Sequence, residues 1–173
     1  ITKRAKAWKQ ANGGEFRYPF LTFMGSVRLN QHDEVSEFLK QLQQLEEPPV
    51  LIVFDTLSRC IPGTDENLQG PMTLVTDECH RLKLTLGSTV GLIHHTDKSG
   101  DRDRGSSVVK NEADYVMRVV KDKPTGIITV SSEKAREGDH FADFYLKLKP
   151  VGDSVVVIEN DQGPEGTEPT RKD

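Results

Sequence analysis

Two short apolar runs, each followed by polar side chains, decide the fold class of this chain. The first is VLIVFDT at residues 50–56, and the second is TVGLIHHT at residues 89–96. A continuous apolar run of this length is typical of a parallel strand buried on both faces of its sheet. Because α/β proteins bind ligands at the carboxyl edge of such strands, the polar residues at the two ends mark a candidate site.

Helical patterns surround these runs. Apolar residues recur at alternate steps of four and three from Leu68 to Leu86, which predicts a long helix. Gly70 precedes Pro71 as the expected cap, and Gly87 ends the helix. Further helices are predicted over two other segments, residues 2–11 and 33–45.

The remaining strands lie on both sides of this helical region. A short one is predicted over residues 19–24. A series of strands follows the second apolar run, over residues 114–120, 126–131, 142–149 and 155–158. Alternating helices and strands followed by a run of strands predict an α/β domain with an antiparallel extension at its carboxyl end.

Composition limits the classes of protein that this chain can belong to. It has 173 residues, 35% of them hydrophobic, and a net charge of −4, which fits one soluble domain and excludes a uniformly basic nucleic-acid coat protein. The two cysteines, Cys60 and Cys79, form no CxxC pair, so we expect a reducing cytoplasm. No apolar run approaches the roughly 20 residues that cross a bilayer, so no membrane association is expected.

Asp55 is the first candidate for chemistry. An aspartate at a strand end can hold Mg²⁺ through the water shell of the ion, with Thr56 beside it. The alternative is a purely structural aspartate that caps the following turn.

His94 and His95 are the second candidate. Imidazoles at a neighbouring strand end can sense a phosphate, bind a metal or relay a proton. Adjacent strand residues point to opposite faces, so the two cannot serve one site equally, and bonds to loop backbone are the structural alternative. A metal-dependent hydrolase using Asp55 with these histidines is a further alternative, but no well-spaced third ligand accompanies it.

Two groups of cations follow in the sequence. Lys98, Arg102 and Arg104 lie among aspartates in the loop 96–105, which is either a solvated mixed-charge loop or a contact for nucleic-acid phosphates. Lys134 and Arg136, two residues apart at a strand end, can stabilise phosphate charge, including that of a neighbouring subunit.

Three longer stretches carry a family resemblance: LIVFDTLSRCIPGTDEN, LGSTVGLIHHTDKSGDRDRGSSVVKNEADYVMRV and ITVSSEKAREGD. In order and spacing, roughly residues 1–159 resemble the RecA-like AAA-type ATPases related to the RepA replicative helicases of plasmids and phages. The chain therefore looks like a partial RecA-like P-loop NTPase core. Residues 160–173 contain no apolar side chain to bury and are predicted to be a disordered tail.

The resemblance implies roles for the candidate residues. Asp55 matches the Walker B aspartate, and His94 or His95 matches the strand-end sensor of the γ-phosphate. The loop 96–105, with Lys98, Arg102 and Arg104, and the segment 59–70 match the regions that contact single-stranded DNA. Lys134 and Arg136 match the KxR pair that reaches the neighbouring nucleotide across a ring interface. Asp114 stands where the family places a cation.

The largest departure from the family is that no GxxxxGK[ST] motif occurs in the sequence. That loop supplies the backbone cradle and the lysine that hold the phosphates of Mg·ATP. We therefore expect this chain to be the carboxyl-terminal part of a hexameric DNA helicase or replication motor. The intact parent is expected to use Mg²⁺ and ATP. The isolated chain is expected to bind neither tightly. The alternative is a non-catalytic subunit of such a ring.

Overall fold

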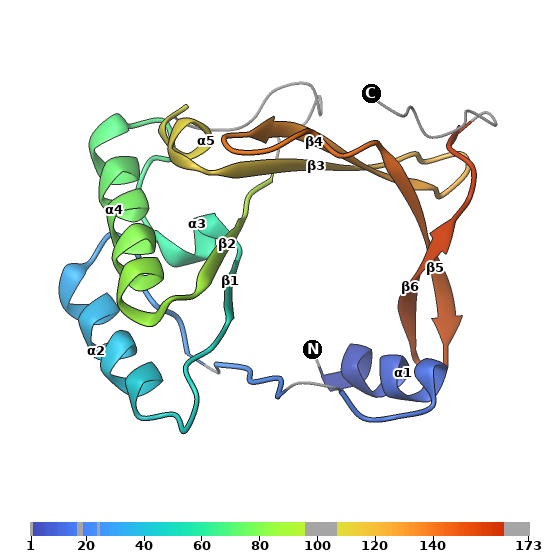
Figure 1. Ribbon diagram of the computed structural model, residues 1–173, viewed down its shortest axis with the longest axis horizontal. Coiled ribbons are helices and arrows are strands. Elements are labelled where there is room, and N and C mark those ends of the chain that lie inside the picture. The colour runs from blue at the N-terminus through green and yellow to red at the C-terminus, as the bar shows by residue number, and fades with distance from the viewer. Residues whose placement is uncertain (1, 17–18, 24, 96–106, 165–173) are drawn as a thin grey trace. The chain divides into compact units, whose positions relative to one another are not determined.

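The computed structural model describes residues 2–16, 19–23, 25–95 and 107–164. The chain forms two compact units (Figure 1). Unit 1 comprises Ile1–Leu21 together with Ala113–Asp173, and unit 2 comprises Thr22–Glu112. The architecture is α/β, with one parallel and one antiparallel sheet. The prediction of a single domain over residues 1–159 therefore stays a prediction.

Unit 2 contains the two apolar runs as strands. Its elements are α2 (His32–Gln43), β1 (Leu51–Asp55), α3 (Leu57–Cys60), α4 (Gln69–Leu86), β2 (Thr89–Ile93) and α5 (Val108–Glu112). Strands β1 and β2 pair in parallel, with Leu51 opposite Thr89 and Asp55 opposite Ile93. The predicted strands and the connecting helix are confirmed.

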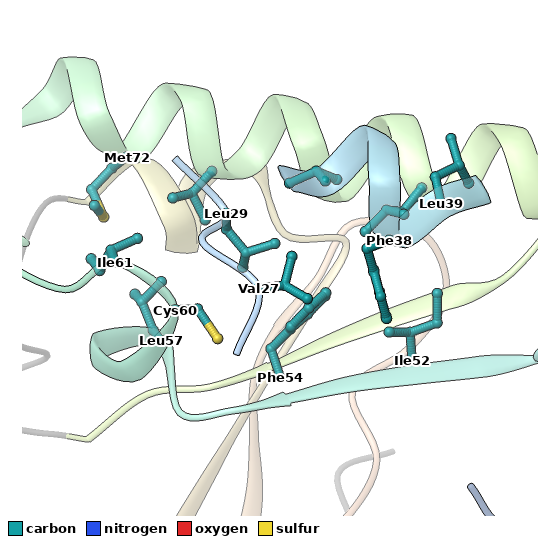
Figure 2. Close-up of a cluster of buried hydrophobic side chains, with 13 residues drawn as sticks. Val27, Leu29, Phe38, Leu39, Ile52, Phe54, Leu57, Cys60, Ile61 and Met72 are labelled. Carbon is teal, nitrogen blue, oxygen red and sulfur yellow. The ribbon is translucent and has the colours of Figure 1, made fainter. Parts of the chain in front are cut away.

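The core of unit 2 lies on one face of this strand pair. Ile52 and Phe54 point from β1 toward the helices, and the Phe54 ring lies 6.1 Å from that of Phe38 (Figure 2). Leu51 and Val53 alternate with them and remain 55% and 52% exposed. The prediction of a strand buried on both faces is therefore wrong, because within unit 2 the helices pack against one face only.

The long helix α4 begins two residues earlier than the predicted cap at Gly70 implies, so that prediction is wrong. Leu68 is the N-cap, so Gly70 and Pro71 both lie inside the first turn, where a missing proline N–H costs no hydrogen bond. Gly87 ends the helix in the left-handed conformation at φ +67°, and its N–H donates to the carbonyl oxygen of Lys83. This end confirms the role predicted for Gly87.

Unit 1 combines one helix with an antiparallel sheet. Its elements are α1 (Thr2–Asn12), β3 (Tyr115–Lys121), β4 (Ile128–Ala135), β5 (Phe144–Val151) and β6 (Ser154–Asn160). The strands follow one another in the order β3-β4-β5-β6, with a register shift between Val116 and Met117. Helix α1 contacts mainly β6 and also β5 (Figure 1). The predicted antiparallel extension is confirmed.

The predicted strand over residues 19–24 is wrong for the part that the structure describes. Residues 19–23 form no strand, and Phe20 and Leu21 are 59% and 67% exposed. The apolar composition was misleading because a strand also requires a neighbouring strand to satisfy its backbone, and the sheets use others.

Two remaining observations concern the ends of the chain and the membrane. Residues 165–173 of the predicted tail lie outside the described residues, while Asn160 closes β6 and its side chain donates to the carbonyl of Gln162. Within the described parts of the chain, no helix has both the length and the apolar character that a bilayer span requires.

Candidate functional site at the carboxyl edge of β1 and β2

The acid and the first imidazole follow neighbouring strands at the same edge. Asp55, the last residue of β1, lies opposite Ile93 in the parallel register, and His94 comes directly after Ile93. Parallel strands place their carboxyl ends together, which is why two residues almost forty positions apart in sequence meet at one edge. The structure thus brings together the strand ends that sequence reasoning singled out.

The chain turns sharply after Asp55. The Asp55–Thr56 peptide bond is cis, and Thr56 is the N-cap of α3. The Thr56 carbonyl oxygen accepts hydrogen bonds from the N–H groups of Arg59 and Cys60, at 3.0 and 3.2 Å. The Thr56 hydroxyl lies 3.0 Å from that of Ser58. These contacts hold two oxygen-bearing side chains next to each other at the strand end.

Helix α3 anchors this turn in the core. Leu57 is fully buried, and the Cys60 side chain is buried beside it (Figure 2). Burial raises the pKa of the Cys60 thiol, and the nearby Asp55 carboxylate raises that pKa further. The dependence on Asp55 shows that the negative charge lies close to the anchor.

His94 is held by a residue that sequence reasoning did not single out. Its Nε2 lies 2.8 Å from a carboxylate oxygen of Glu66, and both side chains are only about one-fifth exposed (22% and 23%). Because a carboxylate only accepts, this bond places a proton on Nε2. The signal in the sequence was a pair of adjacent acids, Asp65 and Glu66, within the segment 59–70, which the resemblance had associated with DNA rather than with the imidazole.

The loop that carries Glu66 is fixed on both sides of it. The Asp65 carboxylate accepts the N–H and the side-chain amide of Asn67 at 2.9 and 2.7 Å, which lowers the pKa of Asp65. The Thr64 hydroxyl accepts a hydrogen bond of 2.8 Å from the Asn30 amide. Glu66 therefore projects from an ordered turn, and its contact with His94 is a built feature of the edge.

His94 and His95 differ in their surroundings, as expected for adjacent residues at a strand end. His94 is partly buried against Glu66, whereas His95 is exposed. The sequence left open which of the two is the candidate phosphate sensor. The structure distinguishes them by giving an ordered partner to His94.

The remaining predicted site residues lie in other parts of the sequence. Lys98, Arg102 and Arg104 lie outside the described residues. Lys134 and Arg136 belong to unit 1, in β4 and directly after it. The Arg136 N–H donates to the Asp114 carbonyl at 2.8 Å, and its guanidinium lies 3.5 Å from the Asp114 carboxylate. The residue that departs from the family pattern is thus an ion-pair partner of Arg136.

The donor set at the edge fits magnesium. Asp55 offers carboxylate oxygens at an exposed position and Thr56 adds a hydroxyl, and Mg²⁺ prefers oxygen ligands while keeping several waters. Among the described residues, no group of three or more His, Cys, Asp or Glu side chains is placed to hold a metal. The structure therefore gives the metal-dependent hydrolase alternative no third ligand within those residues.

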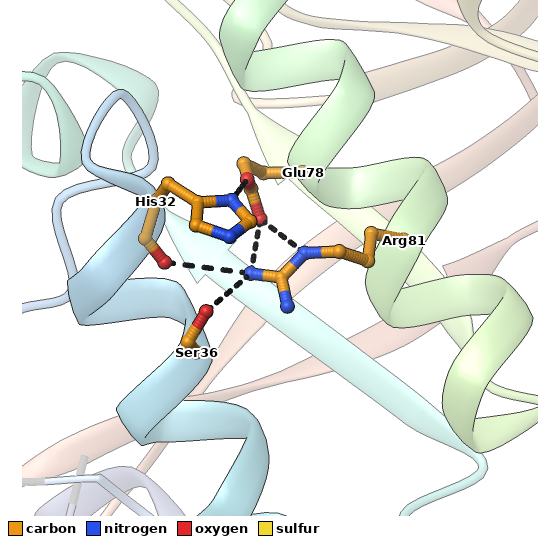
Figure 3. Close-up of polar contacts among 4 residues, drawn as sticks. All are labelled: His32, Ser36, Glu78 and Arg81. Atoms are coloured by element: carbon orange, nitrogen blue, oxygen red, sulfur yellow. Dashed lines mark hydrogen bonds and ion pairs between the residues drawn. The ribbon is translucent and has the colours of Figure 1, made fainter.

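A polar cluster within unit 2 joins α2 to α4 (Figure 3). The buried Glu78 carboxylate lies 2.6 Å from His32 Nδ1 and accepts a 2.7 Å bond from Arg81 Nε. Arg81 also donates to the Ser36 hydroxyl at 3.2 Å. Burying the carboxylate is tolerated because both of its oxygens have cationic or N–H partners.

In this α/β protein an acid and an imidazole lie at the carboxyl edge of two parallel strands. This is the edge at which α/β proteins generally bind their ligands. The sequence pattern of the AAA domain matches residues 1–101, more than half of the chain. The chain therefore belongs to the AAA domain family, an ATPase-type family, and the match includes Asp55, Glu66 and His94. No curated protein matches the chain.

Proposed function

We propose that the chain supplies the Mg²⁺-facing and γ-phosphate-facing edge of a RecA-like, RepA-related, ATP-dependent DNA helicase or replication motor. The observation that carries the proposal is the register that sets Asp55 opposite Ile93, directly before His94. Membership of the AAA domain family supports ATP as the ligand class. A cytoplasmic location, assembly into a ring and single-stranded DNA as partner are part of the same proposal.

Asp55 and Thr56 would hold the magnesium ion. When bound, Mg²⁺ neutralises the negative charge that develops on a transferring phosphoryl group. The Asp55 carboxylate would accept hydrogen bonds from water in the ion's shell, and the Thr56 hydroxyl would add a neutral oxygen beside it. Because Leu57 and Cys60 of α3 are buried, the backbone that carries Asp55 and Thr56 is anchored in the core.

Glu66 would link the phosphate sensor to the DNA-contacting segment. The bond to Glu66 occupies Nε2 of His94 and leaves Nδ1 for a second partner. A change at the nucleotide that moves the imidazole therefore pulls on the segment 59–70 through one hydrogen bond. Glu66 is in this proposal a positioning residue rather than a catalytic one.

Imidazole ¹⁵N spectra of the full chain test the link. Wild type is expected to show His94 with its proton on Nε2. Glu66→Ala is expected to shift the population toward the other tautomer, and Glu66→Asp to restore part of the wild-type signal, whereas Glu46→Ala, a matched change at an exposed acid, leaves it unchanged. Identical His94 spectra in wild type and Glu66→Ala would show that the link does not exist in solution.

Lys134 and Arg136 would act on the nucleotide of a neighbouring subunit. Both are cations at the end of β4, and a guanidinium can stabilise transition-state charge when supplied in trans. The ion pair with Asp114 positions the Arg136 side chain at this end of the sheet.

ATP titration of the chain, alone and mixed with an intact RepA-type ATPase, tests the proposal. We expect no saturable micromolar Mg·ATP binding by the chain alone, because its sequence holds no GxxxxGK[ST] motif. In the mixture we expect it to change the homologue's DNA-stimulated turnover, and Asp55→Asn to alter that effect. A mixture in which wild type and Asp55→Asn behave identically overturns the role of Asp55.

The second candidate is a non-catalytic subunit of such a ring, and the missing GxxxxGK[ST] motif favours it. This candidate keeps the trans-acting cations without using its own Mg²⁺ site. In the same mixture, Arg136→Ala would then abolish the effect on turnover while Asp55→Asn leaves it intact. The first candidate instead requires both substitutions to act.

A further inference from the structure

Helix α1 is a cationic surface in unit 1. Every charged residue within it is basic, namely Lys3, Arg4, Lys6 and Lys9. Among the described residues, Lys9 forms an ion pair with the carboxylate of Glu15. Ala7 is buried, and α1 packs on β6, so the cations occupy the outer sides of the helix. Such a surface attracts phosphates from any source.

Three aromatic rings stack beside these cations. The Trp8 and Phe16 rings lie 4.7 Å apart and only 20° from parallel, and Phe16 lies 5.6 Å from Phe20 at 33°. Lys9 Nζ lies 5.5 Å from the centre of the Phe16 ring. The first pair is stacked and the second is tilted, so the three rings form one contiguous aromatic cluster.

The stack is at the surface rather than in a core. Phe20 is 59% exposed and Trp8 is 38% exposed, although large aromatic side chains gain most when buried. Arg4 lies one helical turn before Trp8, on the same side of α1. Exposed aromatic side chains and cationic side chains therefore lie close together on this surface.

We propose that this surface, formed by Arg4, Trp8, Lys9, Phe16 and Phe20, binds single-stranded nucleic acid. Unpaired bases would extend the aromatic stack, and the cations would contact the phosphates between them. A duplex is a poorer ligand because its bases are already stacked on one another. The surface is made of residues other than those of the loops assigned to DNA above, and the proposal stands whether or not the chain belongs to an ATP-driven motor.

The chemistry of α1 favours nucleic acid over an anionic membrane. A membrane-surface helix buries a broad apolar face in the lipid, whereas the small apolar side of α1 is occupied by β6. Trp8 is the only large apolar side chain in the helix. The positive charge of the surface would attract either ligand, but its exposed aromatic rings favour nucleic-acid bases.

Trp8 fluorescence tests the proposal directly, because Trp8 is the only tryptophan of the chain. The full chain is titrated with a thymidine oligonucleotide of about 12 nucleotides, a length within the usual range of single-strand sites. We expect saturable quenching, and much weaker quenching by inorganic polyphosphate at equal phosphate concentration. Absence of quenching while a labelled oligonucleotide still binds would place the binding site elsewhere and overturn the proposal.

Matched variants separate stacking from charge. By fluorescence anisotropy, Phe20→Ala is expected to weaken oligonucleotide binding about 5-fold to 100-fold, and Phe20→Tyr to retain it. Arg4→Ala is expected to reduce the salt dependence by about one phosphate contact, a slope change of about 0.7. The control Lys123→Ala removes one exposed positive charge from the β3–β4 connection of the same unit. If Arg4→Ala and Lys123→Ala change the salt dependence of oligonucleotide binding equally, binding depends on the net charge of the chain rather than on this surface, and the proposal is overturned.

Two further measurements complete the test. Co-sedimentation with vesicles containing phosphatidylserine, without quenching by the oligonucleotide, would assign the surface to membranes and overturn the proposal. Asp55→Asn is expected to leave Trp8 quenching unchanged, so a failed ATPase proposal and a failed α1 site give different results. Circular dichroism of each variant confirms that the fold is intact.

Discussion

Units 1 and 2 differ in how deeply their side chains are buried. The side chains that are less than 2% exposed all belong to unit 2, and they are Leu29, Val35, Leu57, Ile61, Met72, Val75 and Leu82. The most buried residues of unit 1 keep a little more exposure, as for Ala7 at 4% and Val156 at 5%. A close-packed core fixes side-chain positions. Unit 2 is therefore suited to fixing the side chains of the strand edge, whereas the features of unit 1 discussed above lie on its surface.

The largest effect is expected from removing an anchor of the site. Leu57→Ala leaves a cavity directly behind Asp55 and Thr56, and we expect it to lower the free energy of unfolding by about 2–5 kcal/mol. Val157→Ala in unit 1, at a position 57% exposed, is expected to change it by less than about 0.5 kcal/mol. Urea denaturation checks both. Equal losses would mean that the contrast between the units does not extend to stability.

The thiols provide the second test, through pH. Burial raises the pKa of Cys79 to about 12, with smaller contributions from Cys60 and Glu78. A raised thiol pKa favours the folded state below pH 9 and loses that contribution as the pH rises from about 9 to about 12. Stability of wild type relative to Cys79→Ala should therefore fall over this range. A flat difference between the two would contradict it.

Alkylation kinetics report the same group independently. At pH 8 we expect Cys79 to react with iodoacetamide about a thousandfold more slowly than a thiol of ordinary pKa, because so little thiolate is present. Denaturation in urea is the control, and it should restore the ordinary rate.

A smaller effect is expected at the polar cluster between α2 and α4. Glu78→Ala leaves His32 and Arg81 without their shared carboxylate, and we expect a loss of about 1–3 kcal/mol. Leu39→Met, a conservative change in the same helix pair, is the control for packing. If Glu78→Ala lowers the free energy of unfolding no more than the control does, the polar cluster does not contribute to stability.

The smallest effect is expected in unit 1. Arg136 and Asp114 are both about half exposed, so Arg136→Ala should cost less than about 1 kcal/mol. Because the expected cost in stability is small, an effect of Arg136→Ala on turnover in the mixture with an intact ATPase would reflect function rather than unfolding. A larger loss in thermal denaturation would show that the pair supports the β3–β4 end of the sheet.

The sequence was sufficient for the strands that carry the edge and for the helix between them. The apolar runs ending at Asp55 and Ile93 and the stripe from Leu68 to Leu86 are local patterns, and local patterns determine these elements. The face exposed by Leu51 and Val53 could not be predicted, because apolar composition does not say how many layers cover a sheet.

The Glu66–His94 contact was beyond sequence reasoning for a different reason. The two residues are separated by 28 positions and by the whole of α4, so their meeting depends on the path of the loop and on the turn at Asp65. The stack of Trp8, Phe16 and Phe20 was missed likewise, since the segment containing Phe20 was expected to be a strand.

Helix α1 lies on strands made from the opposite end of the chain, and this has a consequence for biosynthesis. As the polypeptide leaves the ribosome, residues 22–112 can complete unit 2 while α1 still lacks its sheet. The helix must wait until residues 144–160 have emerged, and during that interval the side of α1 that carries Ala7 lacks the strands that bury it.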